Sequence, residues 1–180
     1  LPTPFGLVRS GVAPDHQGTK NVWRVFHRTA HRDQVRFVGN VEVGRDVSVQ
    51  ELLELYDAVV LAVGATVDRR LGIEGEDLHG VYGSGAFTSW YNGHPSHAGL
   101  APELKGPGIA VIGNGNVAVD VVRVLGRRRQ EMVKTDIPDY AMEAIEAADY
   151  TEIYMLGRRG PMDASFTTAE LRELGEMEET

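Results

Sequence analysis

The chain of 180 residues contains no cysteine, which excludes structural disulfides, thiolate metal sites and CxxC redox chemistry. No apolar run approaches the ~20 residues that a membrane-spanning helix needs, and no basic-then-apolar leader opens the sequence. The formal net charge of −8 argues against nucleic acid as a partner, because a phosphate backbone requires a basic surface. The histidines lack metal-ligand spacing, so we expect no metal site, and P-loop and nucleophile-elbow motifs are also absent.

The two ends of the sequence suggest a fragment of a longer protein. The chain begins at Leu1 rather than at a methionine, and residues 176–180 continue a helical pattern without a stop signal. The apolar share of 42% is nevertheless close to that of globular domains. We therefore expect parts of one or two packed domains.

The first 107 residues are read as loops, helices and strands of a sheet. Hydrophobic spacing predicts a helix over 19–31, and Ser48-x-x-Glu51 forms a capping box that opens a short helix. Residues 35–43 are read as a strand, with a hairpin around Gly39–Asn40 as an option. The apolar run 58–63 suits a central parallel strand buried on both faces, and 64–107 is expected to be mostly loop.

The second half alternates strands and helices. A buried strand is predicted over 108–113 and a second strand over 152–156, with helices over 116–125 and 139–148. Thr167-x-x-Glu170 is read as the capping box of a final helix. This alternation predicts a parallel sheet with right-handed crossovers.

The strongest local signal is the segment GNGNVAVD, which runs from Gly113 to Asp120. It has the G-x-G-x-x-A form and follows a predicted strand and precedes a predicted helix, as a pyrophosphate-binding turn requires. Gly113 permits the tight turn, Gly115 lets the backbone approach the phosphates, and Ala118 lets helix and strand pack closely. The alternative is a tight strand-to-helix turn without a ligand.

An arginine pair indicates which nucleotide this turn would bind. The strand 152–156 is followed by Gly157, Arg158 and Arg159, where an NAD site usually places an acid for the ribose hydroxyls. Two guanidiniums suit a 2′-phosphate instead, although a solvated pair at a strand end is the alternative. The 45 residues from Gly113 exceed the roughly 20 of the compact fingerprint, so residues 126–150 are read as an insertion.

At this point the sequence resembles the adrenodoxin reductase family, the NADPH–ferredoxin reductases that include mitochondrial enzymes and FprA-type bacterial relatives. The resemblance covers nearly the whole chain, with its matching motifs in the family's order. These motifs are LPTPFGLVRSGVAPDH (1–16), GNVEVGRDV (39–47), YDAVVLAVGA (56–65), WYNGHP (90–95), GNGNVAVD (113–120), KTDI (134–137), GRRGP (157–161) and FTTAELRE (166–173).

The resemblance implies an FAD-binding domain into which an NADP-binding domain is inserted. Residues 1–65 would belong to the first domain and 66–180 to the second, both incomplete in this fragment. The resemblance also implies the roles of individual residues. They are FAD contacts at Leu7 and Val43, the NADP turn at Gly113, Asn114, Gly115, Asn116 and Val117, 2′-phosphate contacts at Arg158 and Arg159, an NADP-contacting acid at Glu170, and catalytic polar groups near the flavin–nicotinamide junction at His16 and Glu173.

Each residue carried by the resemblance alone has a simpler explanation. His16 would fit as a hydrogen-bonding residue in a Pro/Gly loop, and Glu170 is explained by the capping box with Thr167. Glu173 would pass as surface, and Leu7 and Val43 as core. The family commonly has a Leu-Gln pair after GRRGP, whereas Met162 and Asp163 stand here, and an acid so near the phosphate site would weaken NADP binding.

The sequence is thus interpreted as an α/β protein built from two Rossmann-like dinucleotide-binding domains. The intact enzyme is expected to pass a hydride from NADPH to FAD and then single electrons to a ferredoxin-type iron–sulfur protein, while the fragment alone is expected to be inactive. Alternatives are another FAD/NADPH oxidoreductase, such as a relative of the glutamate synthase small subunit, or a non-catalytic NADP-binding module. The expected location is the cytoplasm in a bacterium or the mitochondrial matrix in a eukaryote.

Overall fold

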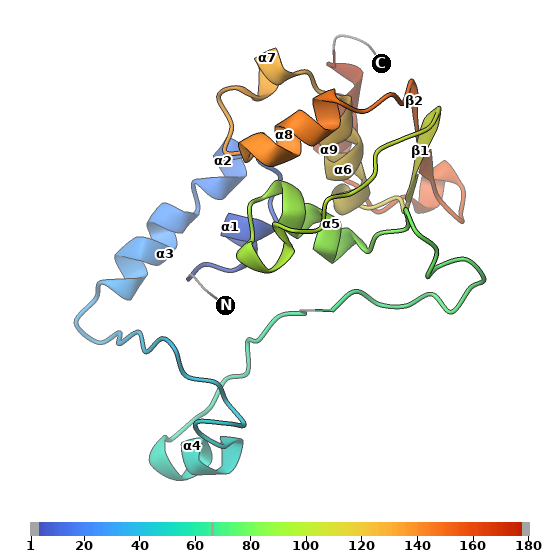
Figure 1. Cartoon of the computed structure of the whole chain (residues 1–180). Helices are drawn as coiled ribbons and strands as arrows, with labels where there is room; N and C mark the ends of the chain where they lie inside the picture. The colour runs from blue at the N-terminus through green and yellow to red at the C-terminus, as the bar shows by residue number, and fades with distance from the viewer. Residues whose placement is uncertain (1–3, 66, 178–180) are drawn as a thin grey trace. The chain divides into compact units, whose positions relative to one another are not determined.

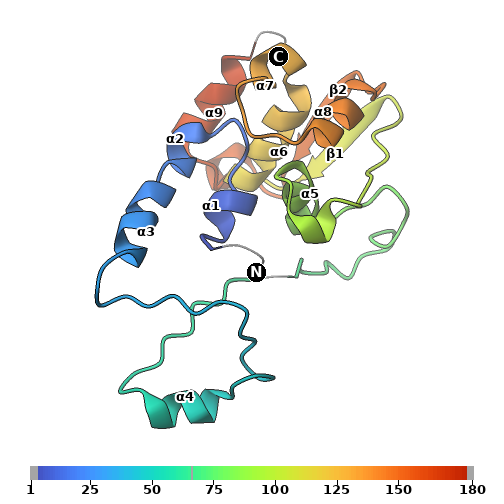
Figure 2. The same ribbon diagram turned by 60° about the vertical axis from the view of Figure 1, so that its left-hand side comes forward.

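The computed structural model describes residues 4–65 and 67–177, which form two compact units. The larger unit combines residues 4–22 with 67–177, and the smaller one comprises 23–65. Figures 1 and 2 show the helices and strands of both units in two views. None of the helices formed by these residues is both long and apolar enough to cross a membrane.

A pair of parallel strands organises the larger unit. β1 (Gly108–Ile112) and β2 (Glu152–Leu156) pair in register from Gly108 opposite Glu152 to Ile112 opposite Leu156. Parallel neighbours need a long crossover, which here contains α6 (Asn116–Gly126), α7 (Arg129–Met132) and α8 (Asp139–Glu146). After β2 come the short 3-10 turn η2 (Pro161–Asp163) and α9 (Thr168–Gly175). The predicted α/β class with a parallel sheet is confirmed.

One face of this strand pair is covered and the other is exposed. Ile109, Val111 and Ile153 pack against the apolar core, and α6 contacts both strands. On the opposite face the side chain of Ile112 is 71% exposed. The prediction that strand 108–113 is buried is therefore wrong for the described residues, because helices cover only one of its faces.

The core lies between α6, α8 and α5 (Ser84–Tyr91), a helix in the segment that the sequence indicated to be mostly loop. The buried side chains come from all three helices. They are Phe87, Trp90 and Tyr91 of α5, Val121, Val124 and Leu125 of α6, and Ala141, Met142 and Ile145 of α8. The Tyr140 hydroxyl donates to the Trp90 carbonyl at 2.8 Å, which ties the start of α8 to α5. A short 3-10 turn, η1 (Pro95–His97), follows α5.

The N-terminal segment of the larger unit contains α1 (Leu7–Ser10) and α2 (Gln17–Lys20). Lys20 is buried and its ammonium lies 2.8 Å from an Asp136 carboxylate oxygen and 2.9 Å from the Asn92 side-chain oxygen. Lys20 therefore connects Asp136 of the KTDI motif with Asn92 of the WYNGHP motif. The sequence predicts an FAD-binding domain over 1–65 and an NADP-binding domain over 66–180. This division stays a prediction, because it depends on which cofactor each part binds.

The smaller unit contains two helices joined by extended chain, α3 (Trp23–Ala30) and α4 (Val49–Leu55). The predicted capping box of α4 is confirmed. The Ser48 hydroxyl accepts from the Glu51 amide at 3.1 Å, and the Glu51 carboxylate accepts from the Ser48 amide at 2.8 Å. The single helix predicted over 19–31 is instead two helices, because α2 ends at Lys20 and α3 begins at Trp23.

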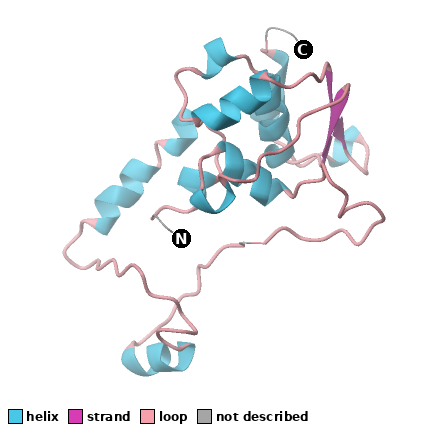
Figure 3. Cartoon of the chain, viewed as in Figure 1, coloured by secondary structure: helices cyan, strands magenta, loops and turns pink. Residues whose placement is uncertain are grey.

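The strands predicted in the smaller unit are not formed. Residues 35–43 and 58–63 are drawn as loop (Figure 3), and the pairing described in this unit is an isolated bridge between Val43 and Val47. Val60 is 87% exposed. Apolar character favours a strand only where neighbouring strands satisfy its backbone and cover its side chains, and residues 23–65 supply no such neighbours.

Candidate nucleotide site and charge cluster

The glycine-rich turn connects β1 to α6 and is built as its sequence predicts. The Gly113 amide donates to the Leu156 carbonyl at 2.9 Å, so the turn begins at the end of the strand pair. Gly113 has φ +146°, a region that favours glycine. A β-carbon on Gly113 would lie 3.6 Å from that of Ala118, so the two small residues allow the close approach of helix and strand.

The N-terminus of α6 is open to an anion. Gly115 is its N-cap, and no side chain of the described residues caps it. The first amides of a helix have no intrahelical acceptor and carry the positive end of the helix dipole. Such an end binds phosphate readily. The positions from Gly113 to Val117 therefore fit the pyrophosphate of a dinucleotide.

The turn is in contact with the loop that follows β2. The Asn114 carbonyl accepts from the amides of Ser165 (2.8 Å) and Phe166 (3.1 Å), and the Asn116 side-chain oxygen accepts from the Thr167 amide at 2.9 Å. A β-carbon on Gly157 would overlap the Asn114 side chain, 1.8 Å from Nδ2. Gly157 is thus required for this contact, which brings the chain entering Arg158 and Arg159 beside the turn.

Arg158 and Arg159 lie on the surface of this loop. Arg159 Nη1 is 3.8 Å from Asp163 Oδ1, and both side chains are more than half exposed. This is the acid that departs from the family pattern. An exposed pair of this kind is weak, so Arg159 remains available to a stronger anionic partner.

If Arg159 binds the 2′-phosphate of NADPH, as the resemblance implies, we expect Asp163→Asn to lower the Michaelis constant for NADPH by up to about 5-fold. A surface ion pair contributes roughly 0–1 kcal/mol, and the phosphate must displace Asp163 from Arg159. Steady-state kinetics of the intact protein with NADPH and NADH measures the effect, and the NADH value is expected to stay unchanged. A higher Michaelis constant for NADPH in the asparagine variant would contradict the competition between Asp163 and phosphate.

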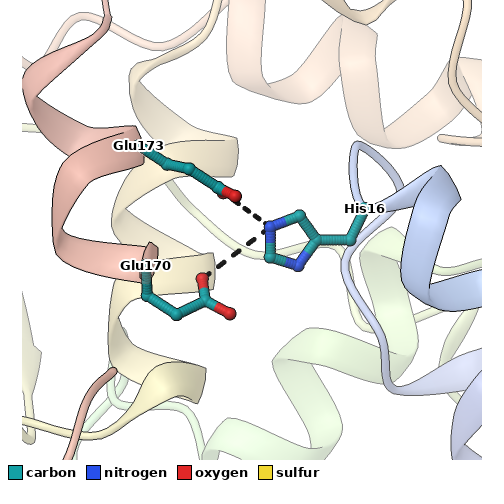
Figure 4. A group of neighbouring side chains, drawn as sticks. All are labelled: His16, Glu170 and Glu173. Atoms are coloured by element: carbon teal, nitrogen blue, oxygen red, sulfur yellow. Dashed lines mark hydrogen bonds and ion pairs between the residues drawn. The ribbon is translucent and has the colours of Figure 1, made fainter. Parts of the chain in front are cut away.

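A second group of polar side chains lies where α9 faces the N-terminal segment (Figure 4). His16 Nε2 is 2.6 Å from Glu173 Oε2 and 3.7 Å from Glu170 Oε2. The two glutamates are three residues apart, so they share one face of the helix. The structure therefore brings His16 to Glu170 and Glu173, which lie more than 150 residues further along the sequence.

Beneath these three residues lies Arg123 of α6, whose side chain is 0% exposed. Its Nη1 is 3.2 Å from Glu170 Oε2 and 3.2 Å from Glu173 Oε2. Its Nη2 is 2.6 Å from Asp120 Oδ1, and its Nε is 2.5 Å from Asp15 Oδ2. One guanidinium thus binds four carboxylates from three segments of the chain.

The two aspartates of this cluster respond differently to their surroundings. Burial alone would raise the pKa of Asp15, but the hydrogen bond and charge of Arg123, with Arg127 and His16, hold the pKa of that carboxyl below its usual range. Burial raises the pKa of Asp120 above its ordinary value despite the attraction of Arg123. Asp120 Oδ1 is also 3.7 Å from His16 Nδ1, so both ring nitrogens have a carboxylate nearby.

The ligand atoms of His16, Glu170 and Glu173 lie within 4.8 Å of one another, a spacing compatible with a metal ion. However, the same two carboxylates already bind the buried guanidinium of Arg123. A cation at this place would be held close to that fixed positive charge. The arrangement favours an ion-pair network over metal coordination.

The sequence explanation of Glu170 as half of a capping box is only partly correct. The Thr167 hydroxyl does accept from the Glu170 amide, at 3.3 Å, but the Glu170 carboxylate turns to Arg123 and His16.

The predicted FAD contacts Leu7 and Val43 lie in different units, and their roles stay predictions.

Sequence reasoning missed Asp15, Asp120 and Arg123. One signal was present, because Asp120 and Arg123 are charged residues three apart in an otherwise apolar helix, NVAVDVVRVLG. On a buried helix this spacing places both charges on one face. The third partner, Asp15, is 108 residues away and carries no comparable signal.

Comparisons with known proteins show close relatives over nearly the whole chain. No protein-family model matches the chain. It is 51% identical over 175 residues to the mitochondrial NADPH:adrenodoxin oxidoreductase of Arabidopsis thaliana, covering 97% of this chain and 36% of the relative. It is 50% identical over 178 residues to the NADPH-ferredoxin reductase FprA of Mycobacterium tuberculosis, covering 99% and 39%. The chain therefore spans little more than a third of these relatives.

The structure matches as well as the sequence does. The solved structure of Mycobacterium tuberculosis FprA in complex with NADPH superposes with a TM-score of 0.92 at 50% identity, over 99% of this chain and 39% of that one. The resemblance that the sequence motifs indicated is thus confirmed, as is the α/β fold.

Proposed function

Because the chain is homologous over nearly its whole length to NADPH:adrenodoxin oxidoreductases and FprA-type NADPH-ferredoxin reductases, we propose that it is part of an NADPH-dependent flavoprotein reductase. The intact protein would pass a hydride from NADPH to FAD and then single electrons to a ferredoxin-type iron–sulfur protein. The observation that carries the proposal is the contact of Asn114 with Gly157, which joins a pyrophosphate turn to the loop of Arg158 and Arg159.

Within this proposal the residues of the turn hold the nucleotide. The backbone from Gly113 to Val117 binds the pyrophosphate at the α6 N-terminus, and Arg158 and Arg159 bind the 2′-phosphate by charge-assisted hydrogen bonds. The proposed cofactors are therefore NADP and FAD.

His16 and Glu173 form the proposed catalytic pair. Their hydrogen bond of 2.6 Å orients the imidazole. Glu170, the proposed NADP-contacting acid, lies 3.7 Å from the same ring nitrogen. Bound FAD supplies the chemistry that converts a two-electron donor into one-electron steps. Leu7 and Val43 are proposed FAD contacts.

The partner and the location follow from the same homology. An iron–sulfur protein of the ferredoxin type is the proposed acceptor, and the proposed location is the cytoplasm in a bacterium or the mitochondrial matrix in a eukaryote. Electron transfer to the acceptor is tested by mixing the intact protein with NADPH and an oxidised [2Fe–2S] ferredoxin under anaerobic conditions. Bleaching of the ferredoxin only when all three components are present is the expected result. Reduction of a quinone or disulfide without any bleaching of ferredoxin would contradict the proposed acceptor.

The 180 residues alone are not expected to hold FAD. FAD pyrophosphate needs a glycine-rich turn at a helix N-terminus, and the one at Gly113–Ala118 is assigned to NADP. Residues 35–43 and 58–63 also form no sheet here, which leaves exposed apolar chain that invites aggregation. The test is to add excess FAD to the purified polypeptide, remove free flavin and record the visible spectrum. A stoichiometric bound-flavin band near ~450 nm, a property of the cofactor, would disprove this prediction.

A further inference from the structure

The buried Arg123 cluster holds more charge than the proposed chemistry uses. Four carboxylates, Asp15, Asp120, Glu170 and Glu173, surround the guanidinium of Arg123. A second arginine, Arg127, lies 3.3 Å from Asp15 through Nη1. Counted without His16, the four acids and two arginines leave two negative charges in excess.

Stability alone does not account for such a cluster. Replacing a buried ion network by packed apolar residues is often neutral or stabilising, because the charges must be desolvated. The neighbouring hydroxyl of Tyr91 is also buried and has no hydrogen-bond partner among residues 4–65 and 67–177, and burial raises its pKa. A polar cluster that costs desolvation free energy is better explained by the geometry it fixes.

That geometry links the proposed nucleotide helix to the proposed catalytic pair. Arg123 lies on α6, whose N-terminus carries the pyrophosphate turn. It binds both glutamates of α9 and also Asp15, the residue that precedes His16. Without a cation between them, the carboxylates of Glu170 and Glu173 would repel each other and move apart. His16 would then lose Glu173 as the partner of its Nε2 atom. The backbone at His16 would also lose the anchor that the preceding residue, Asp15, forms with Arg123.

We propose that Arg123 is a positioning residue that locks His16 against Glu173 by binding both α9 glutamates and Asp15 on one guanidinium. The proposal rests on the proposed function, since the pair becomes catalytic only there. The planar fork of arginine is essential, because its separate nitrogens reach different carboxylates. A lysine ammonium is a single point charge and does not reproduce this pattern.

The test uses the intact protein with bound flavin and compares Arg123→Lys with Arg129→Lys. Arg129 pairs with Glu146 on the surface and is the matched control. Anaerobic stopped-flow measurement of flavin reduction at saturating NADPH is expected to give a 10- to 100-fold lower rate in Arg123→Lys, since a misplacement of about 1 Å costs up to ~10²-fold. The dissociation constant for NADP⁺ is expected to change less than about 3-fold, because the turn and Arg158–Arg159 are intact.

The pH dependence separates positioning from a general loss of structure. Replacing Arg123 by Met removes the guanidinium that Asp15, Asp120, Glu170 and Glu173 share. Among the described residues this leaves Arg127 beside Asp15, and His16 beside the other three acids. The acidic limb of the rate profile should therefore move to higher pH by about one unit or more. A merely destabilised protein would lose amplitude without moving that limb.

Three outcomes would overturn the proposal. They are an unchanged reduction rate in folded Arg123→Lys, an equal loss in Arg129→Lys, and an unmoved acidic limb in Arg123→Met. If the Arg123 variants do not fold, Asp15→Asn removes only the anchor beside His16 and must lower the rate in the same way; an unchanged rate there overturns the proposal too. Failure of the proposed function is distinct, because the unaltered protein would then show no flavin reduction by NADPH.

Discussion

Replacing Arg158 and Arg159 together by alanine is expected to raise the Michaelis constant for NADPH by about 10²- to 10⁴-fold and to leave that for NADH nearly unchanged. Each charge-assisted hydrogen bond to the 2′-phosphate contributes about 1.5–3 kcal/mol, and every 1.4 kcal/mol is a factor of ten. NADH lacks this phosphate, so the two arginines have nothing to bind on it. The variants are compared with the unaltered intact protein in steady-state kinetics with both nucleotides.

The matched control is Arg129→Ala, which removes another arginine of the larger unit whose partner is Glu146. It is expected to change neither nucleotide's Michaelis constant. An equal rise for NADPH and NADH in the double variant would show that the arginines do not recognise the 2′-phosphate. The nucleotide would then have to be selected elsewhere.

Gly115→Val is expected to weaken NADP⁺ binding by at least ~10²-fold while bound flavin is retained. The backbone of Gly115 is extended, with φ −109° and ψ 174°, so a side chain is not excluded by its conformation. A β-carbon there would lie 3.3 Å from Ser165 Oγ, and the valine methyl groups would fill the space through which phosphate approaches the α6 amides. Isothermal titration of the flavin-loaded protein with NADP⁺ measures the loss.

Gly99→Val is the control for this substitution, since a β-carbon on Gly99 meets no atom within 4 Å. It is expected to bind NADP⁺ normally. Thermal unfolding of both variants shows whether the fold is kept. Normal affinity in folded Gly115→Val would refute the assignment of this turn to the pyrophosphate.

The parts predicted well from the sequence depend on short-range signals. Short continuous runs of residues determine the strands 108–112 and 152–156, the turn from Gly113 to Ala118 and the helix that begins in it. Glycine at Gly113 is required by its φ of +146°, and the alternation of strands and helices is enough to predict parallel pairing. These features needed no knowledge of distant residues.

The parts that were wrong or missed depend on distant partners. The strands expected at 35–43 and 58–63 have apolar sequences, but a strand forms only beside another strand, and residues 23–65 provide none. The cluster around Arg123 joins it to Asp15 and Glu170, whose spacing along the chain reveals nothing of their contact. Asp120, three residues before Arg123 on the same helix, is the partner for which the spacing gave a signal. His16 was found only through the family resemblance, because its contact with Glu173 spans 157 residues.

The most direct test of the central claim is flavin reduction by NADPH in the intact protein that contains this chain. The purified protein is expected to carry bound FAD, and anaerobic addition of one equivalent of NADPH should bleach its visible band far faster than the same amount of NADH. Bound flavin that NADPH reduces no faster than NADH, or a purified, folded protein that neither contains nor takes up FAD, would contradict the account.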